Sequence, residues 1–264
     1  MRLAYRPSDK RLCSGAAVLF VALSACATAA VGPGEVPSNP ATTAELRPVP
    51  NAAAVPFSSV CQLSIHRWTG DNVSTGALIG PNYVLTAAHN VYSPLYNRIS
   101  AGRVRCGRSG DTEAWNPQTA FDAKDQKTAP LYLWWPYSRD YAVVRLREAA
   151  TYPTAYRLLS PEDRQPARGD TVYVAGYPGE DGERGFSGDT MFWAAGEVLK
   201  VTGNLLFYSV DAAGGVSGSP VWMRGPKGEY LIVGVHVAGT HTQATARLID
   251  ARAYRRINAW MSAW

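Results

Sequence analysis

The sequence predicts an all-β fold of two six-stranded antiparallel barrels followed by a C-terminal helix. Two observations predict the barrels: short apolar runs recur in two sets of about six, and 24 Gly and 18 Pro residues separate them. A third predicts the helix, because Tyr254, Ile257, Trp260 and Trp264 recur at helical spacing after Asp250, a residue that can cap a helix. With 46% hydrophobic and 18% charged residues, the chain can bury a core, which excludes general disorder.

Residues 1–27 have the organisation of an export signal. Basic residues ending at Lys10-Arg11 precede an apolar run, Leu12–Leu23, which is shorter than the ~20 residues of a membrane-spanning helix. A buried core helix is the alternative interpretation of this run. The sequence Leu23-Ser24-Ala25-Cys26 resembles the lipobox of bacterial lipoproteins, and predicts acylation of Cys26 and anchoring to a membrane. Ordinary cleavage within Ala25-Cys26-Ala27 fits as well, and predicts free secretion.

Residues 28–56 are expected to form an extended tether or a propeptide. They hold few charges and many alanines, and they show no hydrophobic period. They also hold six prolines: Pro33, Pro37, Pro40, Pro48, Pro50 and Pro56. The folded region is therefore predicted to begin at Phe57.

The predicted folded domain, residues 57–264, divides into a first barrel (57–155) and a second barrel with the C-terminal helix (156–264). The first barrel is assigned the runs Val60–Ile65, Thr75–Ile79, Tyr83–Thr86, Ile99–Cys106, Leu131–Trp135 and Tyr141–Leu146. The second is assigned the runs Thr171–Ala175, Met191–Ala195, Glu197–Val201, Leu205–Val210, Pro220–Trp222, Tyr230–His236 and Ala244–Leu248.

Charge gives little support to nucleic-acid binding. The formal net charge is +5, but without residues 1–27 the chain holds 22 basic and 20 acidic residues and no Lys/Arg run. His236 and His241 lack a further ligand at matching spacing, so we expect no zinc site, no other metal and no cofactor. The expected partners are protein or peptide substrates, and a membrane only through Cys26; no oligomeric state is predicted.

Three distant segments supply a histidine, an aspartate and a serine in the order His89, Asp140, Ser217. A serine hydroxyl is a poor nucleophile unless a histidine takes its proton, and a buried carboxylate can hold that histidine in the required tautomer. The alternatives are a core histidine at position 89, a salt bridge between Asp140 and Arg139, and Ser219 as the nucleophile.

Glycines around the serine predict an oxyanion hole. Gly214 and Gly215 permit unusual backbone angles, so the amides of Gly215 and Ser217 can point at one spot. Donors placed in this way stabilise the transition state of acyl transfer by about 3–4 kcal/mol each.

The two cysteines outside the leader, Cys61 and Cys106, are expected to form one disulfide in an oxidising compartment. Such a bond would enclose a long loop in the first barrel, which is worth roughly 3–5 kcal/mol of stability. The alternative is a pair of buried free thiols.

Five ordered motifs together resemble the chymotrypsin-fold serine proteases, and most closely their bacterial V8-like glutamyl endopeptidase branch. They are Tyr83-Val84-Leu85-Thr86-Ala87-Ala88-His89, Asp140-Tyr141-Ala142, Gly176-Tyr177-Pro178-Gly179, Gly215-Val216-Ser217-Gly218-Ser219-Pro220-Val221 and Gly234-Val235-His236. The resemblance covers the chain from about Phe57 to its end. It implies two barrels with the active site in the cleft between them, and an enzyme exported from a bacterial cell.

The resemblance also implies a substrate pocket made by His236, Ala212 and Gly239. In the V8-like branch the matching histidine binds the Glu side chain before the scissile bond. A threonine of that branch is replaced here by Ala212, which places strict Glu preference in doubt. Asp211 matches the position at which trypsin-like enzymes select Arg or Lys, although V8-like relatives often carry an aspartate there without basic specificity.

Activation is expected to differ from that of trypsin-like zymogens, because Val216 replaces the aspartate that pairs with their new N-terminus. The sequence thus predicts an exported serine endopeptidase that acts through an acyl-enzyme on Ser217, with a preference for acidic residues before the cut. It is lipid-anchored in the cell envelope, or secreted or periplasmic. The alternatives are a non-catalytic relative that binds protein in the cleft and an esterase with the same triad.

Overall fold

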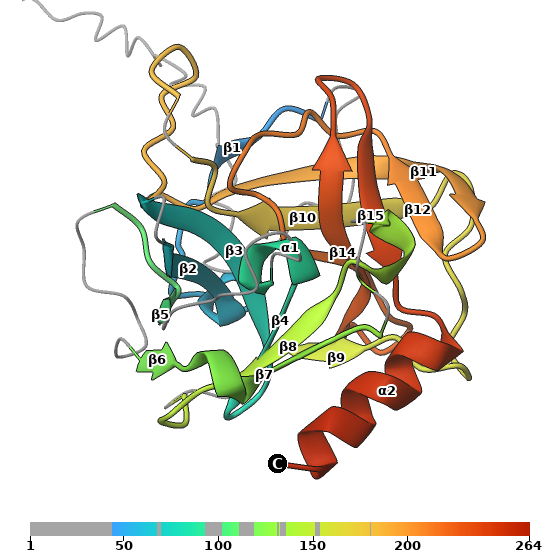
Figure 1. Cartoon of the computed structure of the whole chain (residues 1–264). Coiled ribbons are helices and arrows are strands. Elements are labelled where there is room, and N and C mark those ends of the chain that lie inside the picture. The colour runs from blue at the N-terminus through green and yellow to red at the C-terminus, as the bar shows by residue number, and fades with distance from the viewer. Residues whose placement is uncertain are drawn as a thin grey trace, which may run out of the picture. The chain divides into compact units, whose positions relative to one another are not determined.

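The computed structural model describes residues 44–67, 70–92, 102–110, 119–130, 132, 136–150, 154–179 and 181–264. The predicted signal peptide, Cys26 and the first part of the predicted tether lie outside these residues. Within them the predicted fold class is confirmed, with two mainly antiparallel barrel units and a C-terminal helix, α2 (Ala251–Ser262) (Figure 1). The short helix α1 and three 3-10 turns lie between strands: α1 (Ala88–Val91), η1 (Phe57–Ser59), η2 (Ala123–Asp125) and η3 (Tyr137–Arg139).

The first unit is a curled sheet of seven strands in the order β6-β5-β2-β3-β4-β8-β7. Its strands are β2 (Val60–Arg67), β3 (Gly70–Gly80), β4 (Tyr83–Thr86), β5 (Gly102–Cys106), β6 (Thr119–Phe121), β7 (Gln126–Thr128) and β8 (Ala142–Arg145). Alternate residues of β2, Leu63 and Ile65, are fully buried, as expected for strands with one face on a core. In the described residues β6 and β7 do not pair, so this unit is a half-barrel and not a closed six-stranded barrel.

The second unit closes into the predicted six-stranded barrel. Its strands are β10 (Thr171–Gly176), β11 (Phe192–Thr202), β12 (Leu205–Tyr208), β13 (Pro220–Arg224), β14 (Tyr230–Gly239) and β15 (Ala244–Leu248). They follow the order β11-β10-β13-β14-β15-β12, and β12 pairs back to β11. β9 (Tyr156–Leu158) adds to β14 in parallel. Closure leaves no free edge in the ring, so backbone donors and acceptors are paired all round it.

The folded unit begins before Phe57, the start that the sequence predicts. β1 (Arg47–Pro48) pairs with β11, and the next residue, Val49, is buried in the core of the second unit. The Asp211 amide donates to the Ala44 carbonyl at 2.9 Å. The predicted tether therefore includes a segment that packs on the second unit. The sequence gives no signal for it, because the strand has only two residues, lies among prolines and shows no apolar period.

Helix α2 packs on the second unit, to which the sequence assigns it, and also contacts the first. Its cap is the predicted one, because the Asp250 carboxylate accepts from the Ala253 amide at 2.7 Å. Ile257 is fully buried in the larger core. Trp264 stacks on Tyr83 of β4, with 5.7 Å between ring centroids. The helix thus ties the first unit to the second.

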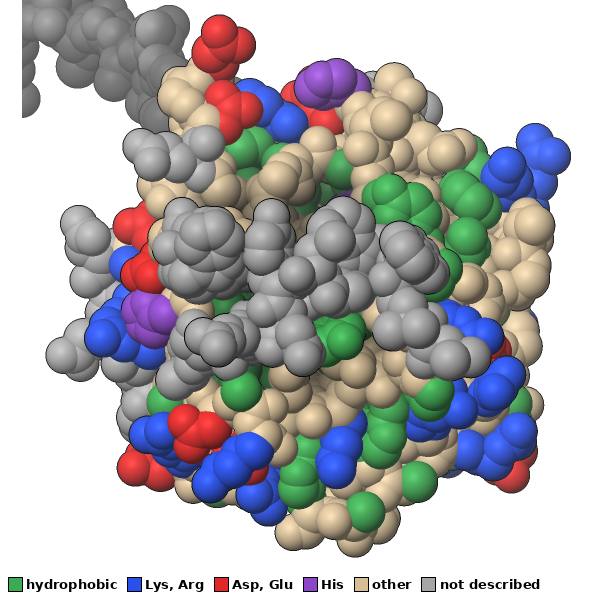
Figure 2. Space-filling model, in the orientation of Figure 1, with side chains coloured by type: hydrophobic (Ala, Val, Ile, Leu, Met, Phe, Trp, Pro, Cys, Tyr) green, Lys and Arg blue, Asp and Glu red, His purple; other side chains and the backbone are tan. Residues whose placement is uncertain are grey.

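The outward side of α2 is basic. Arg252 and Arg255 are exposed there, and Figure 2 shows Lys and Arg side chains gathered along the lower part of this face. In the described part of the chain, no helix has the length and apolar content required to cross a membrane.

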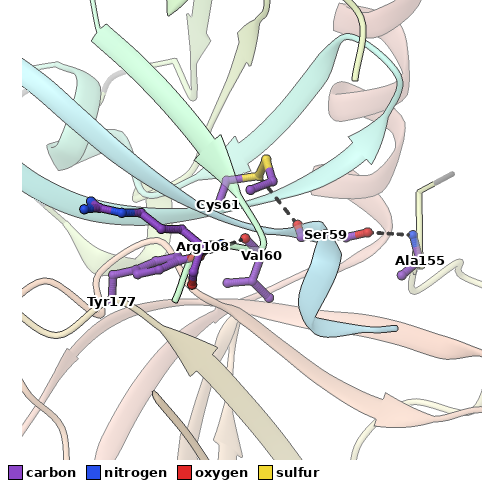
Figure 3. The surroundings of a disulfide bond; sticks show 7 residues. Ser59, Val60, Cys61, Arg108, Ala155 and Tyr177 are labelled. Carbon is purple, nitrogen blue, oxygen red and sulfur yellow. Dashed lines mark hydrogen bonds between the residues drawn. A yellow bond between two sulfur atoms is a disulfide. The ribbon is translucent and has the colours of Figure 1, made fainter. Parts of the chain in front are cut away.

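The structure contains the expected disulfide between Cys61 and Cys106 (Figure 3). The two cysteines face each other directly on β2 and β5 and are 45 residues apart in the sequence. Tyr177, from the end of β10 in the second unit, lies beside Val60 and Arg108 in the same region (Figure 3). The disulfide therefore lies near the seam between the two units.

Candidate active site

Strand pairing in the first unit brings His89 and Asp140 together. β4 leads into α1, which carries His89, and Asp140 directly follows η3 and precedes β8. β4 and β8 are antiparallel neighbours, with Thr86 opposite Ala142. Two residues separated by 51 positions are thus placed at the same end of adjacent strands.

The Asp140 carboxylate holds His89 at two points. Its Oδ2 lies 2.7 Å from His89 Nδ1, and its Oδ1 accepts from the His89 backbone amide at 3.0 Å. The Asp140 side chain is 2% exposed and that of His89 31% exposed, so the acid is buried while the imidazole reaches solvent. The Arg139 guanidinium instead donates to the Pro130 carbonyl at 2.8 Å.

The turn before β13 presents Ser217 beside α1. The Ser217 carbonyl accepts from the side-chain amide of Asn90 at 2.8 Å and from the Thr75 amide at 3.0 Å. Because Asn90 follows His89 in the chain, the serine turn of the second unit is bonded to the helix that carries the histidine. Ser219 is completely buried, whereas Ser217 is half-buried, which favours Ser217 over Ser219 as the accessible alcohol.

Four consecutive amides in this turn, residues 214–217, donate to no acceptor among the described residues. The amides that follow are bonded: Gly218 donates to the His236 carbonyl at 2.8 Å and Ser219 to the Val216 carbonyl at 3.0 Å. Gly215 has φ +85°, a conformation that favours glycine. Its position also needs glycine, because a Cβ there would lie 2.5 Å from the Tyr177 carbonyl oxygen. Among the described residues, this turn thus holds four amide donors without an acceptor.

The predicted pocket residues lie around β14. His236 is 2% exposed, and its Nδ1 lies 2.7 Å from the Tyr208 hydroxyl. Burial, with a smaller contribution from nearby His89, lowers the pKa of His236 to about 3, so this imidazole is neutral at ordinary pH. Burial also raises the pKa of Tyr208.

Gly239 and Ala212, two of the predicted pocket residues, lie against each other. A Cβ built on Gly239, at the end of β14, would clash with the Ala212 side chain. The Ala212 amide also donates to the Thr240 carbonyl at 3.0 Å.

Asp211, the residue that trypsin-like specificity would use, is already paired. Its carboxylate lies 2.7 Å from the Arg184 guanidinium and 3.3 Å from His241 Nδ1. Arg184 also stacks over Phe186, 4.7 Å from the ring centroid. A partly buried carboxylate with a fixed guanidinium partner is a poor receptor for a second cation.

A sequence profile of the family described as Trypsin matches residues 49–261. The chain belongs to the trypsin family.

Relatives of this trypsin-family chain include two curated bacterial proteins. The glutamyl endopeptidase of Bacillus licheniformis is 26% identical over 180 residues, which cover 66% of this chain and 51% of that protein. A protein of Bacillus subtilis named extracellular metalloprotease is 23% identical over 230 residues, which cover 85% of this chain and 70% of that protein. The match thus spans about half the length of the glutamyl endopeptidase.

A solved structure, a Glu endopeptidase in complex with MPD, superposes with a TM-score of 0.66 at 25% identity. The superposition covers 81% of this chain and 95% of the other. These likenesses confirm the predicted resemblance to the V8-like branch, and the trypsin-family protein is a serine endopeptidase.

The name of the B. subtilis relative refers to a metal, and it is a statement about that protein. In the part of this trypsin-family chain that the structure describes, no group of three or more His, Cys, Asp or Glu side chains could hold a metal ion.

Sequence reasoning missed four residues of this trypsin-family site: Thr75, Asn90, Arg184 and Tyr208. Three of them act through contacts between residues distant in the sequence, which no local pattern reveals. Asn90 had a usable signal in the sequence, because it is a polar residue directly after the motif that carries His89.

Proposed function

We propose that the protein is an exported endopeptidase that uses Ser217 as nucleophile, His89 as general base and Asp140 to orient the histidine. The observation that carries this proposal is the 2.7 Å contact between His89 Nδ1 and Asp140 Oδ2. The residue after His89 on the same helix, Asn90, donates a hydrogen bond to the Ser217 carbonyl. Acid and base are thereby bonded directly, and the backbone of the residue that carries the alcohol is bonded to the helix that carries the base.

The first half of the reaction forms an acyl-enzyme. The Asp140 carboxylate accepts a hydrogen bond from the Nδ1–H of His89 and stays ionised, so Nε2 carries no proton and can take the hydroxyl proton of Ser217. As that proton moves, the Ser217 oxygen bonds to the substrate carbonyl carbon, and one electron pair of the C=O bond moves to the oxygen. When the C=O bond reforms, the C–N bond breaks and His89 gives its proton to the leaving amine.

The second half releases the product. Water gives a proton to His89 and adds to the acyl carbon, and collapse of this second intermediate breaks the bond to Ser217. The proton returns to the serine oxygen and a carboxylic acid leaves. The free amides of Gly215 and Ser217 are suited to bind the negative oxygen in both intermediates, because they cost no reorganisation when charge develops.

Substrates with an acidic residue before the cut fit the pocket best. When the Tyr208 hydroxyl donates to Nδ1 of the neutral His236, the hydrogen of that imidazole is on Nε2, where it can donate to a carboxylate. Asp211 is neutralised by Arg184 and so gives Lys or Arg no advantage. The names of the glutamyl endopeptidase relatives agree with this preference.

Export is supported by the signal-like residues 1–27, by a disulfide of the kind that persists in oxidising compartments, and by the name of the extracellular relative. Attachment through Cys26 is tested by detergent phase partitioning of the wild type and Cys26→Ala. A lipid-anchored protein moves to the aqueous phase on substitution; identical aqueous behaviour of both would indicate free secretion.

Covalent labelling tests the nucleophile. A fluorophosphonate should label the wild type and Ser219→Ala, the matched control in the same turn, but should not label Ser217→Ala. Persistent labelling of Ser217→Ala would overturn the assignment. An unlabelled, folded wild type, with residues 1–43 removed or present, would favour a protein-binding relative.

Peptide cleavage tests the substrate class. A peptide series that differs only at the residue before the cut should be cleaved fastest with Glu or Asp there. Preference for Lys or Arg would contradict the pocket assignment. Hydrolysis of matched esters without any hydrolysis of amides would instead make the protein an esterase.

A further inference from the structure

Thr75 of β3 belongs to the first unit, yet among the described residues its hydroxyl is hydrogen-bonded only to backbone groups of the second. It donates to the Gly215 carbonyl at 2.9 Å and accepts from the Tyr177 amide at 2.9 Å. Thr75 is completely buried, so these hydrogen bonds are not exchanged with water. One threonine hydroxyl thus joins the glycine turn before Ser217 to the turn that follows β10.

The backbone of Thr75 is bonded to the same region. Its amide donates to the Ser217 carbonyl at 3.0 Å, and its own carbonyl accepts from the Thr86 hydroxyl at 2.6 Å. Thr86 Oγ1 in turn accepts from Asn90 at 3.0 Å. Thr75 therefore contacts both residues whose amides form the proposed oxyanion hole, Gly215 and Ser217.

Two consecutive peptide planes around Gly215 are held by their carbonyls. The Gly214 carbonyl accepts from the Gly179 amide at 2.7 Å, and the Gly215 carbonyl accepts from Thr75 Oγ1. In a planar trans peptide the N–H points opposite to the C=O. The bond from Gly179 consequently points the Gly215 N–H away from Gly179. The bond from Thr75 holds the next peptide plane, and the two held planes together fix φ and ψ of Gly215, with φ at +85°.

The turn that carries Gly179 is itself fixed to the first unit. The ring of Tyr177 is completely buried, and its hydroxyl accepts from the Arg108 amide at 2.9 Å and donates to the Arg108 carbonyl at 3.1 Å (Figure 3). The Tyr177 amide is bonded to Thr75. Thr75 thus acts on Gly215 directly and on Gly179 through the start of the same turn.

We propose that Thr75 is a positioning residue that sets the direction of the Gly215 amide in the oxyanion hole from across the seam between the two units. This inference rests on the proposed function of Ser217. Thr75 touches no substrate in this arrangement; it acts through the two peptide planes on either side of Gly215.

The test compares Thr75→Val, which keeps the shape and removes the hydroxyl, with Thr75→Ser, which keeps the hydroxyl. We expect Thr75→Val to lower kcat by about 10–100-fold with KM within about twofold, since an oxyanion donor acts mainly on the transition state. Thr75→Ser should stay within about threefold of the wild-type kcat. Fluorophosphonate labelling should slow in parallel with kcat.

Ser59→Ala is the matched control, because Ser59 is also buried and its hydroxyl accepts from the Ala155 amide at 2.9 Å, which is not part of the serine turn (Figure 3). It should lower the melting temperature and leave kcat unchanged. All variants are assayed well below their melting temperatures, so that folded fractions are equal. A Thr75→Val variant that loses stability but keeps the wild-type kcat would overturn the proposal.

Hydrogen exchange separates failure of this inference from failure of the proposed function. If the wild type neither labels nor hydrolyses, the proposed function fails by itself. The Thr75 inference is then judged by amide exchange of Gly179, whose amide donates to the Gly214 carbonyl in the wild type and should exchange at least tenfold faster in Thr75→Val but not in Ser59→Ala. Unchanged exchange would refute it.

Discussion

The side-chain amide of Asn90 donates to the carbonyl oxygen of Ser217 at 2.8 Å, across the seam between the two barrel units. Asn90 is the residue after His89, so the distance between base and nucleophile is set partly by this one bond. It links a short helix of the first unit to the glycine turn of the second.

Replacing Asn90 should therefore reduce turnover more than binding. In Asn90→Asp the carboxylate cannot donate and would face the Ser217 carbonyl, so we expect kcat to fall roughly tenfold or more, with stability reduced by about 1–3 kcal/mol. Steady-state kinetics and fluorophosphonate labelling rates measure the first effect and urea unfolding the second. Wild-type turnover in a destabilised Asn90→Asp would contradict the role in positioning.

Gly215 should tolerate no side chain, whereas its neighbour Gly214 should tolerate one much better. A Cβ on Gly215 meets the Tyr177 carbonyl and the Gly179 amide at a positive φ, while a Cβ on Gly214 meets nothing within 4 Å. We expect Gly215→Ala to lower kcat by roughly 100-fold or more, the cost of one lost oxyanion donor. Equal losses in the two alanine variants, measured with one amide substrate, would argue against this geometry.

Acid should destabilise the fold through His236. Its folded pKa of about 3 lies below the ordinary value of 6.5, so between these pH values the unfolded chain binds a proton that the folded chain does not. Lowering the pH through this window therefore favours unfolding, by up to about 1.4 kcal/mol per pH unit. Urea unfolding between about pH 4 and 7 should give a flatter dependence in His236→Gln, and an unchanged slope in the exposed control His241→Gln.

Arg184 should exclude basic substrates by occupying Asp211. In Arg184→Ala the Asp211 carboxylate loses its 2.7 Å partner and can receive a substrate cation. We expect kcat/KM for peptides with Lys or Arg before the cut to rise about tenfold relative to Glu peptides, equivalent to 1.4 kcal/mol. Arg184→Lys serves as the charge-preserving control. Selectivity that does not move in Arg184→Ala would exclude this role.

The disulfide should contribute strongly to stability because it closes a loop of 45 residues. The chain-entropy relation gives about 4 kcal/mol for a loop of this length. Cys61→Ala combined with Cys106→Ala should lower the free energy of unfolding by that amount, measured in urea without reductant. A loss below about 1 kcal/mol would mean that the unfolded chain is not restrained by the bond as this relation assumes.

Much of the fold could be predicted because its signals are local. Apolar runs such as Tyr83–Thr86 and Tyr230–His236 mark strands wherever they pair, and Asp250 marks the start of α2 without reference to the rest of the chain. The docked segment at Arg47–Pro48 could not be predicted, because its partner strand lies far along the sequence and its own prolines suggest an open chain.

The candidate site divides in the same way. His89, Asp140 and Ser217 stand in recognisable motifs, so their roles are predictable from residue type and order. Thr75 and Tyr208 are ordinary strand residues in sequence terms. What distinguishes them is a hydroxyl group that hydrogen-bonds to a residue distant in the sequence, across the seam for Thr75 and within the second barrel for Tyr208. Only the tertiary structure brings these groups together.

The serine turn belongs to the second unit by sequence, but the Ser217 carbonyl is held by two residues of the first, Thr75 and Asn90. If these contacts between the units were lost, each unit could keep its own strands intact while the protein lost its catalytic activity. Activity reports on the junction between the halves more than on either one, and a molecule that wedged them apart would inhibit without entering the cleft.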